Sequence, residues 1–352
     1  MTLREVDAAP GAPWGVELRG SVERLVVESE LLTGNPLGDP ARRPLYVYLP
    51  PGAERDGERR YPVIYVIQGF TGQIDMWVTR NPFELNMFER ADELFSDLEV
   101  PPAILVFVDA WTSVGGSQFI NSIGTGPYMD YLCDEIVTFV DGNFPTIPDS
   151  GHRALTGKSS GGYGAMVVPM LRRDVFGALA THAGDSLFEV CYLCEFREAA
   201  RNLRDNWDGS FDRMWEELRA ADHMDWDKFQ PFEVYGYALC YSPDPVSPGK
   251  PLLPFDVATG ALVLEVWDKW LEWDPIRIAP NHLDDLASMK HIYIDAGKSD
   301  EYFLDLGAAA FSKVLATAGI DHFFELFSGK HGGMQYRYPK ALRQLALALD
   351  PA

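Results

Sequence analysis

Residues 153–165 read RALTGKSSGGYGA, and this stretch is the strongest indication of the fold class in the sequence. Its first four residues fit a short buried strand, and a helix is expected from about Gly162 to Arg172. Between them lies a G-x-S-x-G motif with Ser159 at its centre. Strand and helix pass so closely there that side chains at Gly157 and Gly161 would collide. The setting predicts Ser159 as a nucleophile; the alternative is a glycine- and serine-rich turn without chemistry.

Strands and helices alternate on both sides of this motif. The runs Tyr61–Ile67 (YPVIYVI) and Ala103–Val108 (AILVFV) are continuous and apolar, the pattern of strands buried on both faces. Further strands are expected at Leu25–Val27, Leu45–Leu49, Phe176–Thr181, His291–Ile294 and Phe323–Phe327, and helices at about 128–144, Phe303–Ala318 and Tyr338–Leu349. Strand alternating with helix predicts an α/β fold with a mostly parallel central sheet flanked by helices.

The alternation breaks between Asp185 and Asp285, a region called the inserted segment below. It combines helical stretches with proline-rich loops and holds six of the nine tryptophans. We interpret residues 1–352 as a single domain in which residues 185–285 form an aromatic-rich lid or cap. The tryptophan rings either pack inside this segment or face a ligand.

The charge of the chain limits its partners. Thirty Lys and Arg against 52 Asp and Glu give a net charge of −22, about half of which lies in the inserted segment. Such a chain repels nucleic acid and anionic membranes, so neither is an expected partner. No stretch has the length of a transmembrane span, and MTLREVDAAPGAPWG at the N-terminus has no signal-peptide core. We therefore expect a cytoplasmic protein.

The four cysteines are too few for a disulfide scaffold. Cys191 and Cys194 have metal-ligand spacing, but the sequence offers no second pair beside them. Two cysteines on one face of a helix is the simpler interpretation.

A serine nucleophile needs a base, and His331 is the best placed of the seven histidines. It lies in a glycine-rich loop, Ser328-Gly329-Lys330-His331-Gly332-Gly333, between the last expected strand and helix. Its acid partner should follow the preceding strand, where Asp295 and Asp300 are the candidates. Asp300 is favoured because it lies in the loop, whereas Asp295 continues the strand. As alternatives, Asp295 would stabilise a turn and Asp300 would cap a helix.

An oxyanion formed at Ser159 would need two backbone N–H donors. We expect one from Ser160 and the other from Phe70, which follows Gly69 in the loop after an early strand. Gln68, Lys158 and Asp185 are further candidates for contact with substrate.

These motifs resemble the putative-esterase branch of the α/β-hydrolases, which includes S-formylglutathione hydrolases, feruloyl esterases and enterochelin esterases. The likeness rests on residues 61–69, on GGSQFINS at 115–122, on GKSSGGYGA at 157–165 and on IDAGKSD at 294–300. The resemblance implies Ser159 as nucleophile, Asp300 as acid and His331 as base. Gln68 and Lys158 depart from the family, where histidine is common at both positions.

The expected activity is hydrolysis of small-molecule carboxylic esters or thioesters through an acyl-enzyme, with no metal or organic cofactor. Transfer of the acyl group to another alcohol by the same residues is one alternative. A non-catalytic binding protein on the same fold is another. The sequence does not determine the oligomeric state.

Overall fold

The computed structural model describes residues 4–5, 17–80, 82–223 and 225–351. Among these residues, nine strands form one sheet in the order β1-β2-β3-β5-β4-β8-β9-β10-β11. The strands are β1 (Arg4–Glu5), β2 (Ser21–Glu28), β3 (Arg42–Leu49), β4 (Val63–Ile67), β5 (Ile104–Val108), β8 (Arg153–Lys158), β9 (Ala178–His182), β10 (His291–Gly297) and β11 (Phe323–Phe327). The strands from β5 to β11 are parallel, whereas β2 and β3 pair antiparallel with their neighbours. The predicted α/β fold with a mostly parallel sheet is confirmed.

The central strand β4 shows why the sheet is buried on both sides. All five of its residues are buried. Val63, Tyr65 and Ile67 join one hydrophobic core, whereas Ile64 and Val66 join another on the opposite face. Successive side chains of a strand point to opposite faces, so a continuous apolar run serves two cores at once.

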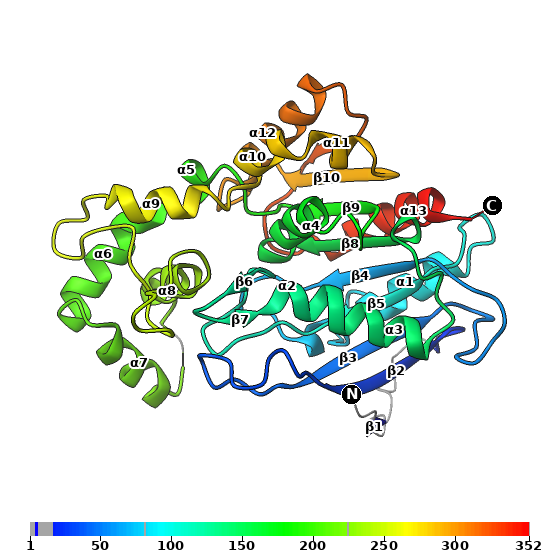
Figure 1. Cartoon of the computed structure of the whole chain (residues 1–352), viewed down its shortest axis with the longest axis horizontal. Coiled ribbons are helices and arrows are strands. Elements are labelled where there is room, and N and C mark those ends of the chain that lie inside the picture. Colours follow the sequence, from blue (N-terminus) through cyan, green and yellow to red (C-terminus); the bar gives the residue numbers. More distant parts are fainter. Residues whose placement is uncertain (1–3, 6–16, 81, 224, 352) are drawn as a thin grey trace.

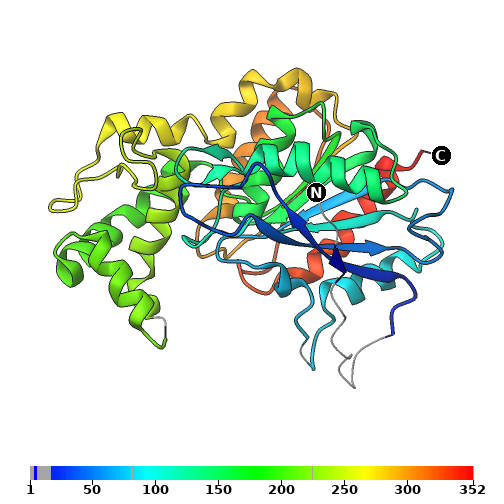
Figure 2. The same cartoon turned by 60° about the horizontal axis from the view of Figure 1, so that its bottom comes forward.

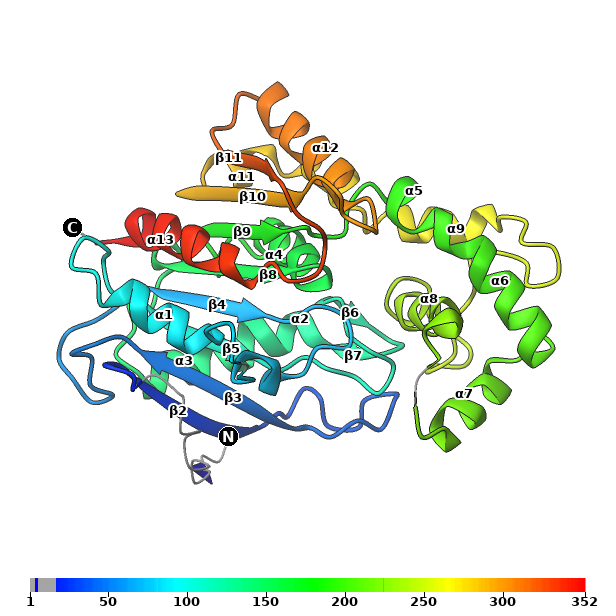
Figure 3. The ribbon, with the colours of Figure 1, turned by 180° about the vertical axis from the view of Figure 1, so that it is seen from behind.

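Helices cover both faces of the sheet (Figures 1 and 3). In Figure 1, α2, α3 and α4 lie in front of the sheet, and Figure 3 shows α1 and α13 on the opposite face. The bounds of the helices flanking the sheet are α1 (Met87–Phe95), α2 (Tyr128–Asp130), α3 (Val137–Asn143), α4 (Ser160–Leu171), α12 (Leu304–Thr317) and α13 (Tyr338–Leu349). A π-helical stretch, Tyr131–Ile136, joins α2 to α3.

Helix α1 was not predicted, although its start carries a recognisable signal. The Asn86 side chain accepts the N–H of Glu89, and the Glu89 carboxylate accepts the N–H of Asn86. This capping box follows from an Asn and a Glu three residues apart.

The inserted segment lies at one end of the sheet (Figure 2). Between β9 and β10 the described chain adds no strand to the sheet and forms helices instead. They are α5 (Phe188–Cys191), α6 (Leu193–Trp207), α7 (Phe211–Ala220), α8 (Phe229–Tyr241), α9 (Leu264–Leu271), α10 (Pro275–Ile278) and α11 (Leu283–Ala287). Helix α10 contacts α4 and α12, which ties the end of the segment to the sheet. A separate cap bounded by residues 185 and 285 stays a prediction.

Two other expectations concern the chain as a whole. Most of the N-terminal stretch in which no signal peptide is expected lies outside the described residues. Within the described residues, no helix is long and apolar enough to cross a membrane.

Candidate active site

The turn that carries Ser159 joins β8 to α4, as the motif predicts. Ser159 has φ 59° and ψ −127°, a strained conformation for a residue with a side chain. A Cβ on Gly157 would lie 2.5 Å from the carbonyl oxygen of Gly161, and one on Gly161 would lie 2.5 Å from that of Ile67. The two glycines therefore let β8, α4 and β4 meet closely enough to hold Ser159 in this turn.

His331 lies between Ser159 and Asp300. Its Nε2 is 3.1 Å from the Ser159 Oγ, and its Nδ1 is 2.8 Å from an Asp300 oxygen. The Asp300 side chain is fully buried, and the His331 side chain is 12% exposed. Three residues that come from three separate loops thus form one hydrogen-bonded row, the arrangement that activates a serine hydroxyl.

Neighbouring groups hold the two loops of this row in place. The Asp300 carboxylate accepts the backbone N–H of Tyr302 at 2.9 Å, so it also caps the turn before α12. The backbone N–H of His331 donates to Glu301 at 2.9 Å. This hydrogen bond, with the one from Lys330, lowers the pKa of Glu301 to about 2. The Glu301 carboxylate is therefore ionised at neutral pH and tethers the base loop to the acid loop.

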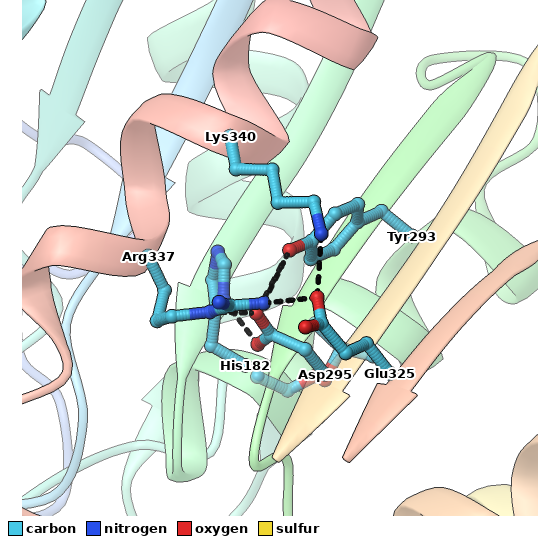
Figure 4. A network of polar contacts seen from close by, with 8 residues as sticks. His182, Tyr293, Asp295, Glu325, Arg337 and Lys340 are labelled. Carbon is cyan, nitrogen blue, oxygen red and sulfur yellow. Dashed lines mark hydrogen bonds and ion pairs between the residues drawn. The ribbon is translucent and has the colours of Figure 1, made fainter. Parts of the chain in front are cut away.

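Asp295, the other candidate acid, belongs to a separate buried network of polar side chains (Figure 4). Its carboxylate contacts His182 Nδ1 at 2.6 Å, Arg337 at 2.9 Å and the Tyr293 hydroxyl at 2.8 Å. Arg337 also binds Glu325, so it joins the chain after the base loop to β10 and β11. This placement favours Asp300 over Asp295 as the acid, because the buried Asp295 carboxylate already contacts His182.

The loop that should supply the first oxyanion donor lies directly beside Ser159. A Cβ on Gly69 would be 3.3 Å from the Ser159 Cβ and 3.1 Å from the Lys158 carbonyl oxygen. The lack of a side chain at Gly69 therefore permits the close approach of this loop to the nucleophile. No described residue accepts the backbone N–H of Phe70. The N–H of Ser160 lies in the first turn of α4, where it lacks an intrahelical acceptor.

The Phe70 ring connects this loop to the inserted segment. It lies 4.8 Å from the Tyr237 ring and 5.8 Å from the Phe232 ring, both on α8. A Cβ on Gly236 would be 2.9 Å from the Phe70 ring. Helix α8 thus packs against the side chain whose backbone faces Ser159.

A cavity of about 240 Å³ opens above Ser159 and His331. The inserted segment contributes Asp185, Cys191, Tyr192, Glu195, Phe196, Trp226, Phe229, Glu233, Val234, Tyr237 and Trp270 to its lining. Phe70, Lys158 and Tyr302 line it from the sheet side. Most of these side chains are aromatic, and sequence analysis anticipated aromatic rings without identifying which of them face the cavity.

The tryptophans of the inserted segment divide between the two expected roles. Trp226 and Trp270 line the cavity, and Trp226 is 68% exposed. Trp207 and Trp267 are buried in the hydrophobic cores. Packing therefore accounts for some of the rings, and contact with the cavity for others.

Lys158 and Asp185 line the cavity, but Gln68 does not. Burial lowers the pKa of the Lys158 ammonium, against the attraction of Asp300, Asp185 and Glu301. In the amide orientation that satisfies its neighbours, Gln68 donates to the Val108 carbonyl oxygen at 2.6 Å and accepts from the Ala110 nitrogen at 2.8 Å. Backbone groups at the end of β5 satisfy the Gln68 amide. A contact of Gln68 with substrate stays a prediction.

Asp185 belongs to a buried polar cluster beneath the cavity. Its carboxylate accepts hydrogen bonds from Tyr192 at 2.8 Å and from Gln118 and Ser160 at 3.3 Å. Burial raises its pKa, and these donors partly oppose that shift. Sequence analysis missed Gln118 and Tyr192, because only folding brings their segments together.

Glu195 and Glu233 are two further cavity residues that the sequence did not reveal. Both belong to helices of the inserted segment that were not predicted, α6 and α8. Their charge could have been noticed, but nothing local indicates that it faces a cavity.

The cysteines of the described chain are free, and burial raises the pKa of the Cys191 thiol well above its ordinary value. Within the described residues, no group of three or more His, Cys, Asp or Glu side chains has the geometry of a metal site.

The sheet order, the strained serine turn and the loops that carry Asp300 and His331 define the fold as that of the α/β-hydrolases. Residues 40–338 match a family model described as "Putative esterase". The chain belongs to this family, as the resemblance of its motifs predicted.

Known structures and one curated protein extend the comparison. The structure of a ferulic acid esterase aligns with 95% of this chain and over 100% of its own length, with a TM-score of 0.60 and 18% identity. An S-formylglutathione hydrolase from Agrobacterium tumefaciens covers 99% of this chain, with a TM-score of 0.56 and 15% identity. An endo-1,4-beta-xylanase/feruloyl esterase of Xylanibacter ruminicola is 29% identical over 134 residues. Those residues are 37% of this chain and only 18% of that relative.

Proposed function

We propose that this protein is a serine hydrolase that cleaves carboxylic esters or thioesters through an acyl-enzyme on Ser159. The observation that carries the proposal is the position of His331, 3.1 Å from the Ser159 Oγ and 2.8 Å from Asp300. The family to which the chain belongs supports the same class of reaction.

In the first half of the reaction, the Ser159 oxygen attacks the carbonyl carbon while His331 takes the hydroxyl proton. His331 then gives this proton to the leaving alcohol or thiol, and the acyl group stays on Ser159. Water attacks the acyl-enzyme in the second half, and His331 again accepts and returns a proton. Asp300 fixes the imidazole orientation and stabilises its cation.

The carbonyl oxygen becomes negatively charged at each addition step. The N–H groups of Phe70 and Ser160 would donate hydrogen bonds to this oxyanion. Each donor of this kind lowers the activation barrier by about 3 kcal/mol. The position of Gly69 against Ser159 supports this assignment, because it brings the Phe70 backbone beside the nucleophile.

We further propose that the inserted segment covers the acyl group. The aromatic lining from α8 and the contact of the Phe70 ring with Tyr237 support this role. The predominantly apolar cavity favours an acyl or leaving group with a hydrophobic or aromatic part.

The test is turnover of p-nitrophenyl acetate and p-nitrophenyl butyrate by the Ser159→Ala variant. Turnover should fall by about 10⁵-fold, since the nucleophile and its base act as a unit. Ser247→Ala, a substitution in a loop of the inserted segment away from the cavity lining, is the matched control and should keep wild-type rates. Unchanged turnover by Ser159→Ala would refute the proposal.

A further inference from the structure

Two carboxylates face the cavity from adjacent helices of the inserted segment. Glu233 lies on α8 and is only 8% exposed, and Glu195 lies on α6 and is half-buried. Helices α6 and α8 contact each other. Neither glutamate has a place in the hydrolysis described above, so their burial needs another explanation.

Among the described residues, the surroundings of Glu233 supply one hydrogen bond from a side chain and no positive charge. The Tyr237 hydroxyl donates to one of its oxygens at 3.1 Å. Burial raises the pKa of Glu233 to about 8, and repulsion from Glu195 and Asp185 adds to the shift. Burial also raises the pKa of Glu195, against a small opposing effect of the exposed Arg197. An isolated buried carboxyl group is costly unless a partner compensates it.

The cation of the cavity is engaged elsewhere. Among the described residues that line the cavity, Lys158 is the one lysine or arginine. The carboxylates that attract it are Asp300, Asp185 and Glu301, on the side of the nucleophile and the base. When Glu233 and Glu195 are ionised, the negative potential in their part of the cavity is therefore not offset by any lysine or arginine of the described lining near them.

Aromatic side chains surround the same part of the cavity. Trp226, Phe229, Tyr237 and Tyr302 line it together with the two glutamates. Rings beside carboxylates form a favourable environment for an alkylammonium ion, because ring faces attract cations and tolerate their apolar groups. The same surroundings disfavour an anionic substrate.

We propose that this cavity selects carboxylic esters that carry an alkylammonium group, with Glu233 and Glu195 contacting the positive charge. The proposal rests on the proposed ester hydrolysis, since it names the class of substrate that reaches Ser159. It also gives two of the acidic residues of the inserted segment a place in the cavity.

The test measures binding without turnover. Phenyltrimethylammonium and tert-butylbenzene have nearly the same shape and differ in charge. Their dissociation constants for the full-length Ser159→Ala variant, measured by calorimetry at about pH 9 where Glu233 is ionised, should differ by about tenfold in favour of the cation. Equal affinities, or tighter binding of the neutral compound, would overturn the proposal.

Substitutions identify the carboxylates. Adding Glu233→Gln should weaken binding of the cation about tenfold and leave binding of tert-butylbenzene unchanged. Glu195→Gln, at a more exposed position, is the second variant should Glu233→Gln fold poorly. Glu265→Gln on the exposed face of α9 is the control and should change neither constant. Loss of affinity for both compounds in Glu233→Gln would indicate a packing role and contradict the assignment.

The pH dependence separates Glu233 from the other titrating groups of the cavity. Affinity for the cation should rise from about pH 6 to about pH 9, because Glu233 loses its proton near its pKa of about 8. Glu195, Asp185, Tyr237, Tyr302 and His331 also face this cavity, so the part of the rise removed by Glu233→Gln is the diagnostic quantity. A rise that survives this substitution in full would overturn the role of Glu233.

This design separates the two proposals. Cation binding that persists in Ser159→Ala while wild-type turnover is absent would refute hydrolysis and leave the binding site standing. Turnover without any preference for the cation would do the reverse.

Discussion

Two histidine–aspartate pairs stand at the same edge of the sheet, and they differ in what the second ring nitrogen meets. His331 binds Asp300 through Nδ1 and directs Nε2 to the Ser159 hydroxyl, at the floor of a cavity. His182 binds Asp295 through Nδ1, but both side chains are fully buried, and its Nε2 has no partner among the described residues. Its ring lies 4.4 Å from that of Tyr338. We propose that the same chemical pair serves a reaction in one place and structure in the other.

The geometry of the strand that carries both acids explains this difference. Asp295 lies within β10, where its side chain is fixed between β9 and Arg337. Asp300 lies beyond the strand, in a loop that reaches the cavity. Asp300, in the loop, can therefore contact His331 while His331 also contacts Ser159.

The largest expected effect separates the two pairs by activity. Asp300→Asn should lower the turnover number for p-nitrophenyl butyrate by about 10⁴-fold, because the amide no longer holds the active tautomer of His331. Asp295→Asn, the same substitution five residues earlier, should lower it by less than about tenfold. Steady-state rates, corrected for the folded fraction, measure both. Equal losses in the two variants would show that the pairs do not divide as described.

Stability should show the opposite order. Asp295→Asn removes the buried carboxylate that contacts His182 and leaves Arg337 with Glu325 as its remaining described carboxylate partner, and it should reduce the free energy of unfolding by about 3–5 kcal/mol. Asp300→Asn should reduce the free energy of unfolding less, because its partner His331 is 12% exposed whereas His182 is fully buried. Urea denaturation followed by tryptophan fluorescence compares the variants, and a larger loss in Asp300→Asn would contradict the structural role of Asp295.

Acid stability gives the smallest of the expected differences. Burial raises the pKa of Asp295, but the attraction and hydrogen bond of His182, with the bonds of Arg337 and Tyr293, lower it more, so the net shift is downward. A carboxyl group whose pKa is lower in the folded state stabilises the protein above its unfolded value of about 3.9. That contribution disappears as the pH falls through the folded value.

Wild-type stability should therefore fall with decreasing pH below about pH 4, and the Asp295→Asn variant should lose less over the same range. Circular dichroism at a fixed urea concentration measures this slope at several pH values. Parallel pH profiles for the two proteins would show that Asp295 contributes nothing through its ionisation.

Local patterns of sequence explain how much of this molecule could be predicted. The strands, the turn at Ser159 and the order of the acid and base loops follow from periodicity and motif spacing. Asp300 could be preferred to Asp295 because strand and loop positions reach different places. Family resemblance gave the same assignment.

The features that were not predicted depend on contacts between segments that are distant in the sequence. Helices α6 and α8 were not anticipated, and with them the positions of Glu195 and Glu233 above Ser159 were missed. Gln68 was expected to touch substrate, yet backbone groups at the end of β5 hold its amide. Nothing in the residues beside Gln68 shows where that strand end lies, so these partners of the amide could not be predicted from the sequence.

The most direct measurement is labelling by a fluorophosphonate probe, followed by intact-mass analysis and peptide mapping. The wild-type protein should carry one adduct on Ser159, because His331 activates that hydroxyl. Labelling should be abolished in Ser159→Ala and strongly slowed in His331→Ala. A folded wild-type protein that stays unlabelled, or that is labelled at another residue such as Ser160, would contradict the assignment of Ser159 as the nucleophile.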